Sequence, residues 1–516
     1  METNREYLCE RGVSSLLCES VGDYSLPDYN TDVKRILHIK ARAVPSSGFV
    51  DGDSAEFCGI VAYDIVYLDS ENEITSCSFT TDYEIAVRCR QDRCVGSDIR
   101  TRVANYNLRL TGPRRISARA SLISDVHITE RDSVGVEGDA FTVGEPEVLL
   151  TGADVAYSLY SAPVEREYAE QLAVLDGTIA DEVEVLLSTC QPRVTGVSVG
   201  EGSAELHGEL CVRALYKRID EVPELRECCI PISEVVACDG LEEGLTVRPC
   251  INVTSLKVSV DPTEDGAALT ASVITETQLR AVGNTHLSLV ADCYLKERGV
   301  DNEYSDFNYT ESLGGVCATE AVTGELARGE AGTENIRNFI YMSALPKAES
   351  TAINGDTVQI KGEMRFSGIA CEVNEAGEPA YTSVKYDVPF TMNVKYGCQI
   401  PETARVEVIL DATDALPSLD ANTVKLSAQL NAQTFLVVPR RVGYVSSSNT
   451  TDEVFEKESS VVTVYYPTGN ETLFDIARRF HTSTIAVAAD NSLTESVFAD
   501  SDKPFAASGI KKLIIR

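Results

Sequence analysis

The chain has 516 residues, 43% of them hydrophobic, and a formal net charge of −35 at pH 7. The length corresponds to about three or four domains, and the apolar content excludes a wholly disordered chain. The negative charge argues against nucleic acid or an anionic membrane surface as the main partner, because both bind clustered lysine and arginine. Residues 461–516 hold six basic and six acidic side chains, so the whole net charge lies on residues 1–460.

The N-terminal segment, residues 1–24, begins METNREYLCERG and lacks the apolar core of a signal peptide. No run of the chain reaches the roughly 18 apolar residues that a membrane-spanning helix needs. We therefore expect a cytoplasmic protein with no transmembrane segment. The sixteen cysteines include no CxxC pair, so the sequence predicts no metal site and no cofactor, and buried, reduced thiols are the expected state. Oxidative cross-linking of some cysteines in a final assembly remains an open alternative.

The most informative feature of the first 460 residues is a thirteen-residue phrase that occurs three times. It reads DGDSAEFCGIVAY at 51–63, GEGSAELHGELCV at 200–212 and NGDTVQIKGEMRF at 354–366. Each copy opens with turn residues and continues with alternating apolar and polar side chains, which is typical of a hairpin leading into a half-buried antiparallel strand. The apolar face of the third copy holds Val358, Ile360, Met364 and Phe366.

A glycine recurs at one position of this phrase, as Gly59, Gly208 and Gly362. Glycine inside a strand weakens the strand unless backbone or a ring must approach closely. The recurrence at equal phase therefore predicts the same β-bulge or close contact in every copy.

A second repeated phrase indicates that whole domains were duplicated. It reads ISARASL at 116–122, LTASVIT at 269–275 and LSAQLNA at 426–432, and it keeps nearly constant spacing from the first phrase. We therefore expect a mainly β protein with three tandem antiparallel domains of sandwich or barrel type. The expected ranges are 25–150, 165–300 and 338–445 for the domains, 301–337 for a polar linker, 446–460 for a flexible linker, and a short helix within 165–187.

Residues 461–516 carry the pattern of a small strand–helix–helix–strand domain. VTVYY at 462–466 and KKLIIR at 511–516 read as the two strands. Apolar residues of the first helix recur at helical spacing, with Asn470 as its expected N-cap, and Thr482 or Ser483 is placed to cap the second helix. The face of the first helix is formed by Leu473, Ile476, Ala477 and Phe480.

The stretch GNETLFDIARRF at 469–480 resembles the opening of the LysM domain, a glycine turn followed by a Thr-Leu-x-x-Ile-Ala pattern. Gly509 before the closing strand matches the final Gly-x-x-Leu of that family. Three features depart from the family pattern: one extra residue in the first turn, Phe474 in place of the usual tryptophan, and a long loop at 493–508. Both loops beside the family's glycan groove are thereby altered. The tail is expected to form a small groove between its helices and loops, and the rim of that groove is the predicted partner-binding site: Gly469, Asn470, Glu471, Thr472, Leu473, Asp490 and Asn491.

Residues 25–43, SLPDYNTDVKRILHIKARA, resemble the opening of SPOCS domains, the repeated domains of spore-coat assembly proteins. The order of SPOCS-like repeats followed by one LysM-like domain covers essentially the whole chain. It implies a non-enzymatic scaffold on the mother-cell side of the forespore surface, in the cytoplasm. The expected partners are the sporulation coat ATPase, bound by the LysM-like domain, and other coat proteins. The alternative is a peptidoglycan-binding protein of the cell wall or spore cortex that holds N-acetylglucosamine chains.

Catalytic motifs are scarce. GVSVG at 196–200 spells the GxSxG pattern around Ser198, but a strand is expected after it, whereas a nucleophile elbow leads into a helix. The five histidines are scattered, and no phosphate-binding loop is present. The sequence therefore predicts no catalytic residues. An enzyme in the middle repeat remains a third alternative, which would need a clustered acid–base constellation in the folded chain.

Overall fold

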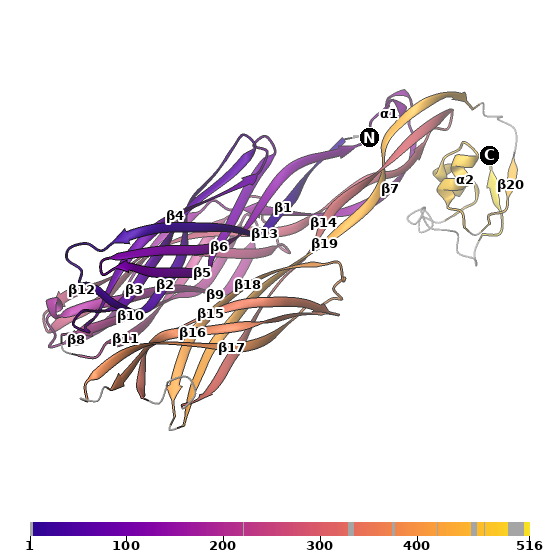
Figure 1. The fold of residues 1–516 in the computed structure, drawn as a ribbon. Coiled ribbons are helices and arrows are strands. Elements are labelled where there is room, and N and C mark those ends of the chain that lie inside the picture. Colours follow the sequence, from indigo (N-terminus) through magenta and orange to yellow (C-terminus); the bar gives the residue numbers. More distant parts are fainter. Residues whose placement is uncertain are drawn as a thin grey trace.

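The computed structural model describes residues 4–219, 221–328, 335–373, 377–420, 422–455, 462–468, 470–493 and 510–516 (Figure 1). Strands account for 77% of the structure and helices for 4%, which confirms the mainly β fold class. Among the described residues, no helix is both long and apolar enough to cross a membrane.

Three consecutive stretches of the chain share one strand order. In unit 1, residues 4–135, a meander β2-β3-β4 forms one antiparallel sheet, and the first, last and fifth strands form the other in the order β1-β6-β5. The strands are β1 (Asn4–Ser25), β2 (Val33–Asp51), β3 (Ser54–Asp69), β4 (Ile74–Arg88), β5 (Cys94–Gly112) and β6 (Arg115–Gly135).

Unit 2, residues 147–294, repeats this arrangement with its first strand divided in two. The meander is β9-β10-β11, and the second sheet has the order β12-β13-β7, with β8 also paired to the long β13. The short helix α1 (Ala140–Val143) precedes this unit, and its elements are β7 (Glu147–Tyr160), β8 (Val164–Asp176), the 3-10 helix η1 (Ala180–Glu182), β9 (Val183–Gly200), β10 (Ser203–Arg218), β11 (Glu224–Ala237), β12 (Thr246–Thr263) and β13 (Gly266–Tyr294).

Unit 3, residues 298–454, has the sheets β15-β16-β17 and β14-β19-β18. In each unit the two sheets face each other, and their edge strands also come close, as β2 does to β5 and β15 to β18. The units are therefore sandwiches with partly closed edges. The strands are β14 (Arg298–Ala327), β15 (Ile336–Asn354), β16 (Thr357–Val373), β17 (Pro379–Lys395), β18 (Arg405–Leu419) and β19 (Thr423–Val454).

The repeated phrases occupy equivalent places in the three units. The first phrase spans the turn before β3, β10 and β16, and Gly52, Gly202 and Gly355 adopt positive φ angles of 56°, 73° and 66° in these turns. The second phrase lies in β6, β13 and β19. The predicted apolar face is also confirmed, because the side chains of Val358, Ile360, Met364 and Phe366 are completely buried between the sheets of unit 3.

The recurring glycines lie at a β-bulge, as predicted. Register shifts fall beside Gly59, Gly208 and Gly362, in the pairing of each glycine's strand with the strand before it. A Cβ atom on these glycines would lie 2.6, 2.2 and 2.1 Å from a carbonyl oxygen of that neighbouring strand. The bulge pushes backbone into the space that a side chain would need.

Several expected boundaries were wrong because long strands extend beyond them. The expected linker 301–337 lies mostly in β14, and the expected linker 446–460 is part of β19 up to Val454; residues 329–334 and 456–460 of these two linkers lie outside the described residues. The N-terminal segment 1–24 is largely β1, and the helix expected within 165–187 is replaced by β8, η1 and the start of β9. β14 is an edge strand with many exposed side chains, so a polar, glycine-rich composition is compatible with pairing there.

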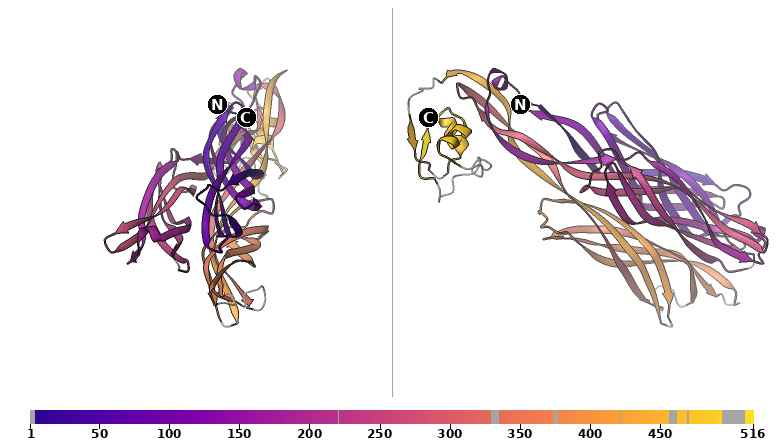
Figure 2. Two further views of the ribbon diagram at one scale, coloured as in Figure 1. Left: turned by 60° about the vertical axis from the view of Figure 1, so that its left-hand side comes forward. Right: turned by 180° about the vertical axis from the view of Figure 1, so that it is seen from behind.

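The three units meet along a shared region, from which they diverge as separate lobes (Figure 2). One junction is an apolar cluster with members from all three units, formed around Leu37, Leu187 and Tyr341. A second cluster joins Val134, Leu287 and Phe307 near the base of an arm. In this arm the ends of β14 and β19, with β7 beside them, extend away from the lobes toward the C-terminal elements (Figure 1).

Candidate functional site

The C-terminal unit, the described part of residues 462–516, has the predicted strand–helix–helix–strand order. Its elements are β20 (Thr463–Tyr465), α2 (Leu473–Arg479), α3 (Thr484–Asp490) and β21 (Leu513–Ile515), and β20 pairs with β21. The predicted helix face is apolar core, because Leu473, Ile476 and Ala477 are buried. Phe480 is half-buried and packs against the same cluster.

The first helix begins two residues later than expected. Thr472, not Asn470, is its N-cap, and its hydroxyl accepts a hydrogen bond from the backbone N–H of Asp475 at 3.1 Å. The Asp475 carboxylate accepts one in return from the N–H of Thr472 at 3.0 Å. This reciprocal capping box satisfies two exposed donors at once, which a cap at Asn470 would not. Ser483 caps α3, as one of the two expected residues.

Glu471 of the predicted rim is bonded within the C-terminal unit. Its carboxylate accepts hydrogen bonds from the Tyr465 hydroxyl at 2.6 Å and the Thr468 N–H at 3.0 Å, and it pairs with Arg479 at 2.7 Å. These donors, first of all the Tyr465 hydroxyl, lower the pKa of Glu471 to about 2. The residue ties the turn after β20 to α2, so its oxygens are already occupied.

Asn491 is likewise a structural residue. Its amide nitrogen donates to the carbonyl oxygens of Val487 and Ile514, and its side-chain oxygen accepts from the Ile514 N–H, each at 2.7 Å. It therefore fastens β21 to the end of α3. Asp490 is half-buried and Asn470 is exposed.

The two halves of the rim, 470–473 and 490–491, are not joined to each other by any hydrogen bond or ion pair among the described residues. Gly469 lies outside the residues that the structure describes.

Exposed apolar side chains mark another face of the C-terminal unit. Val464 lies in β20, and Val462 and Tyr466 flank it at alternate positions of the chain; their exposed fractions are 50, 58 and 67%. Alternate residues of a strand project to the same side, while Tyr465 faces the core of the unit. We call Val462, Val464 and Tyr466 the β20 face. The sequence analysis predicted only a strand for this stretch, although the apolar residues at alternate positions indicated an apolar face.

The side of the C-terminal unit that carries Phe474, Arg478 and Thr482 contacts the arm. The ring of Phe474 packs edge-on against Tyr294 at the end of β13, with centroids 5.1 Å apart, and the Tyr294 hydroxyl donates to the Thr482 carbonyl at 2.7 Å. Arg478 forms an ion pair with Asp292 at 2.7 Å. About 180 residues separate these partners in the chain, so no local sequence pattern could have predicted the contact.

A buried cluster of charges joins the three units at a third place. Glu10 of unit 1 binds Arg280 of unit 2 and accepts from His127 at 2.8 Å. Glu407 of unit 3 pairs with Arg248 at 2.7 Å and lies 3.4 Å from the other ring nitrogen of His127. A cavity of about 170 Å³ adjoins the cluster. The carboxylates are matched by cations, so the arrangement fixes the three units against one another.

Burial and neighbouring charges act in opposite directions at this cluster. Burial alone would raise the pKa of Glu10, but Arg280 and His127 outweigh it and hold that pKa below its ordinary value. Burial would likewise lower the pKa of His127, whereas Glu10 and Glu407 raise it. The cluster is therefore most favourable with the carboxylates ionised and His127 protonated.

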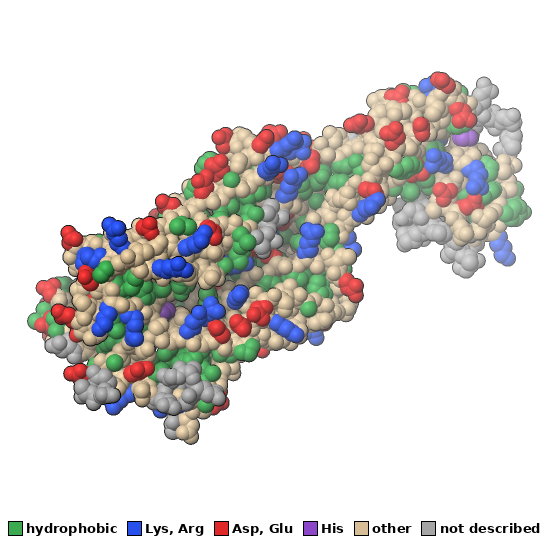
Figure 3. Space-filling view, in the orientation of Figure 1, with side chains coloured by type: hydrophobic (Ala, Val, Ile, Leu, Met, Phe, Trp, Pro, Cys, Tyr) green, Lys and Arg blue, Asp and Glu red, His purple; other side chains and the backbone are tan. Residues whose placement is uncertain are grey.

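Ser198 lies inside β9 and pairs with Glu205 of β10. A nucleophile elbow needs a sharp turn from strand to helix, and Ser198 does not occupy such a turn. Acidic side chains are spread over the visible face of the array and arm, with Lys and Arg among them (Figure 3).

Comparisons of the chain with protein-family models, curated proteins and solved structures found no match.

Proposed function

We propose that this chain is a scaffold of endospore coat assembly, similar to SipL, and that it performs no chemistry itself. Its three sandwich units correspond in this proposal to SPOCS domains and its C-terminal unit to a LysM domain. The scaffold works on the mother-cell side of the forespore surface. It tethers the coat there by binding the sporulation coat ATPase and recruits other coat proteins through the array.

The observation that carries the proposal is the β20 face at the end of the arm. Three exposed apolar side chains, one in β20 and one on each side of it, form a patch of the kind that marks a protein contact. The core side of the same unit is occupied by Tyr294 and Asp292 of the arm. A protein partner is therefore expected on the β20 face, and the interlocked units behind it supply a stiff support.

The test is capture of the purified sporulation coat ATPase by the immobilised full-length chain. Replacing Val464 by Thr together with Tyr466 by Ser should reduce capture at least tenfold, because burying these side chains contributes about 1–3 kcal/mol each. The control is Val235→Thr on β11, a valine of the array that is 63% exposed, and this change should leave capture unchanged.

Peptidoglycan sedimentation in parallel distinguishes the alternative. A wild-type chain that pellets with peptidoglycan but does not capture the ATPase would assign it to the cell wall or cortex, and the scaffold proposal would be wrong. Equal ATPase capture by the double variant and the control would remove the β20 face from the proposal.

A further inference from the structure

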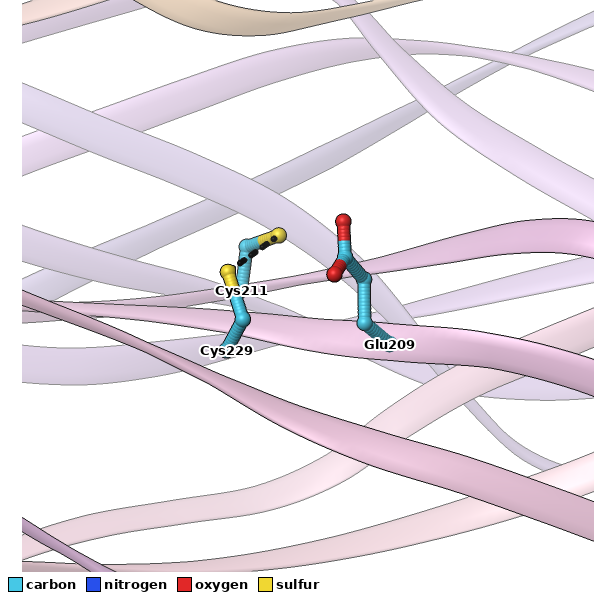
Figure 4. Close-up of side chains that lie close together, drawn as sticks. All are labelled: Glu209, Cys211 and Cys229. Atoms are coloured by element: carbon cyan, nitrogen blue, oxygen red, sulfur yellow. Dashed lines mark hydrogen bonds between the residues drawn. The ribbon is translucent and has the colours of Figure 1, made fainter.

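Two thiols face each other across neighbouring strands of unit 2. Cys211 of β10 and Cys229 of β11 are direct partners in the antiparallel register, and their Sγ atoms lie 3.5 Å apart (Figure 4). Directly opposed residues have Cα atoms about 4.5–5.5 Å apart, and disulfides join Cα atoms about 4.4–6.8 Å apart. Rotation of the side chains is therefore enough to bring the sulfurs to bonding distance.

The two thiols differ in access to solvent. Cys229 is exposed, whereas Cys211 is buried. A reagent in solution therefore reaches Cys229 first, and Cys211 is placed to attack the resulting adduct from the neighbouring strand.

We propose that Cys211 and Cys229 form a reversible disulfide by exchange with a low-molecular-weight disulfide, RSSR. The Cys229 thiolate attacks one sulfur of RSSR, which breaks its S–S bond, releases RS⁻ and leaves Cys229–S–S–R. The Cys211 thiolate then attacks the Cys229 sulfur and expels a second RS⁻. The two departing thiolates take up the protons that the cysteines lose, so two protein thiols and RSSR give one protein disulfide and two RSH.

Other cysteines nearby are poorer reactants. Cys190 and Cys228 point to the opposite face of the sheet and pack against the core of unit 2, where burial raises the pKa of both thiols. Cys89 and Cys94 form a second close pair in unit 1, but burial, with Cys94 beside it, raises the pKa of Cys89 to about 12. The Cys211–Cys229 pair differs from these in geometry, because exposed Cys229 is open to a reagent and Cys211 lies directly opposite it on the neighbouring strand.

The pair lies beside the contact between units 2 and 3. Gln191, opposite Cys211 on β9, donates to Asp411 and to the carbonyl of Ala412 at 2.8 and 2.7 Å. Arg213, two residues after Cys211, donates to the Met342 carbonyl at 3.3 Å. A disulfide would therefore stiffen the sheet whose outer face contacts unit 3.

The test treats the folded full-length chain with oxidised glutathione, blocks remaining thiols by alkylation and maps the peptides by mass spectrometry. The expected product is a Cys211–Cys229 disulfide that lacks glutathione and persists in a Cys228→Ser variant. Exposed Cys398 is the internal control and should stop at a glutathione adduct. Amide hydrogen exchange in β11 should slow on oxidation of the wild type but not of Cys229→Ser.

Two results would overturn the proposal. One is a stable glutathione adduct on Cys229 with Cys211 still alkylated as in untreated protein. The other concerns Glu209, whose carboxylate lies within 4.8 Å of both sulfurs. In this second result, equimolar Zn²⁺ protects both thiols from alkylation without forming a disulfide, and the Glu209→Gln variant loses this protection. That result would identify a metal site instead.

Discussion

Replacing the glycine that recurs in each meander by alanine is expected to lower the stability of the unit that contains it. In unit 2, a methyl group at position 208 would lie 2.2 Å from the carbonyl oxygen of Arg193 and 3.1 Å from the Arg193 carbonyl carbon. Both atoms belong to the backbone of β9, which is held in the sheet, so β9 and β10 would have to separate by about 1 Å to restore ordinary contact.

The expected cost of Gly208→Ala follows from two opposing effects. Overpacking of a close-packed interior costs about 1–3 kcal/mol, and the reduced entropy of the unfolded chain returns about 0.4–1 kcal/mol. A net loss of about 1–2 kcal/mol should lower the thermal midpoint of unit 2 by about 2–8 °C. Differential scanning calorimetry of the full chain measures this shift, and hydrogen exchange in β9 and β10 assigns it to unit 2.

Gly196 provides the matched control, because it lies in β9 of the same sheet and no atom lies within 4 Å of a Cβ added there. Gly196→Ala should leave the midpoint unchanged or raise it slightly. If Gly208→Ala unfolds at the same temperature as Gly196→Ala, the strands separate at little cost and the bulge does not require glycine. Gly59→Ala and Gly362→Ala should behave like Gly208→Ala in their own units.

Three further outcomes follow from buried contacts. Burial lowers the pKa of His38 to about 3. The folded state therefore loses stability as pH falls from about 6.5 toward 3, by about 2 kcal/mol at pH 5. Urea unfolding of the His38→Phe variant should not show this loss. The pH dependence due to His127 has the opposite sign. Its raised pKa stabilises the fold below about pH 6.5, and this contribution disappears as pH rises through the folded pKa. The His127→Gln variant should therefore lose less stability than the wild type between pH 6 and 9. Tyr294→Ala should release the C-terminal unit and increase hydrogen exchange in α2, while the melting temperature of the array stays unchanged. The control is Tyr29→Ala, because the Tyr29 side chain is 87% exposed. Equal hydrogen exchange in the two variants would contradict the docking role of Tyr294.

The local features of the fold were predictable because they are repeated in the sequence. Alternation in 354–366 identified a buried face, the turn residues identified the hairpin, and the equal phase of Gly59, Gly208 and Gly362 identified a bulge before any pairing was known. The order of elements in the C-terminal unit also followed from helical spacing. The alternation, the turn residues and the helical spacing each lie within about fifteen residues, where side-chain periodicity reflects burial directly. The glycine signal came from comparing the three copies of the phrase.

The first strand of each unit escaped this reasoning for a physical reason. β1 and β14 are edge strands that pair on one side only, so much of their surface faces solvent and their residues do not alternate cleanly. β8 carries a helix-like pattern, yet its pairing with β13 decides its conformation, since strand propensity depends on neighbours more than on the segment itself. The predicted rim stays a prediction, but the internal hydrogen bonds of Glu471 and Asn491 could not be read from the sequence, because their partners become visible only in three dimensions.

The junction between the units bears on whether the array acts as a stiff support or as linked, independently moving domains. Arg280 and Glu10 are about 270 residues apart in the chain, and both are buried. Replacing Arg280 would leave the buried Glu10 carboxylate with His127 as its remaining cationic partner. Breaking a buried ion pair by removing one partner typically costs about 3–5 kcal/mol. Arg280→Met should therefore loosen the junction strongly, whereas a double change of Arg280 to Met and Glu10 to Leu should recover much of the stability. Such recovery would show that the loss in the single variant comes from the buried charge left behind, and that apolar packing can replace the ion pair at this junction.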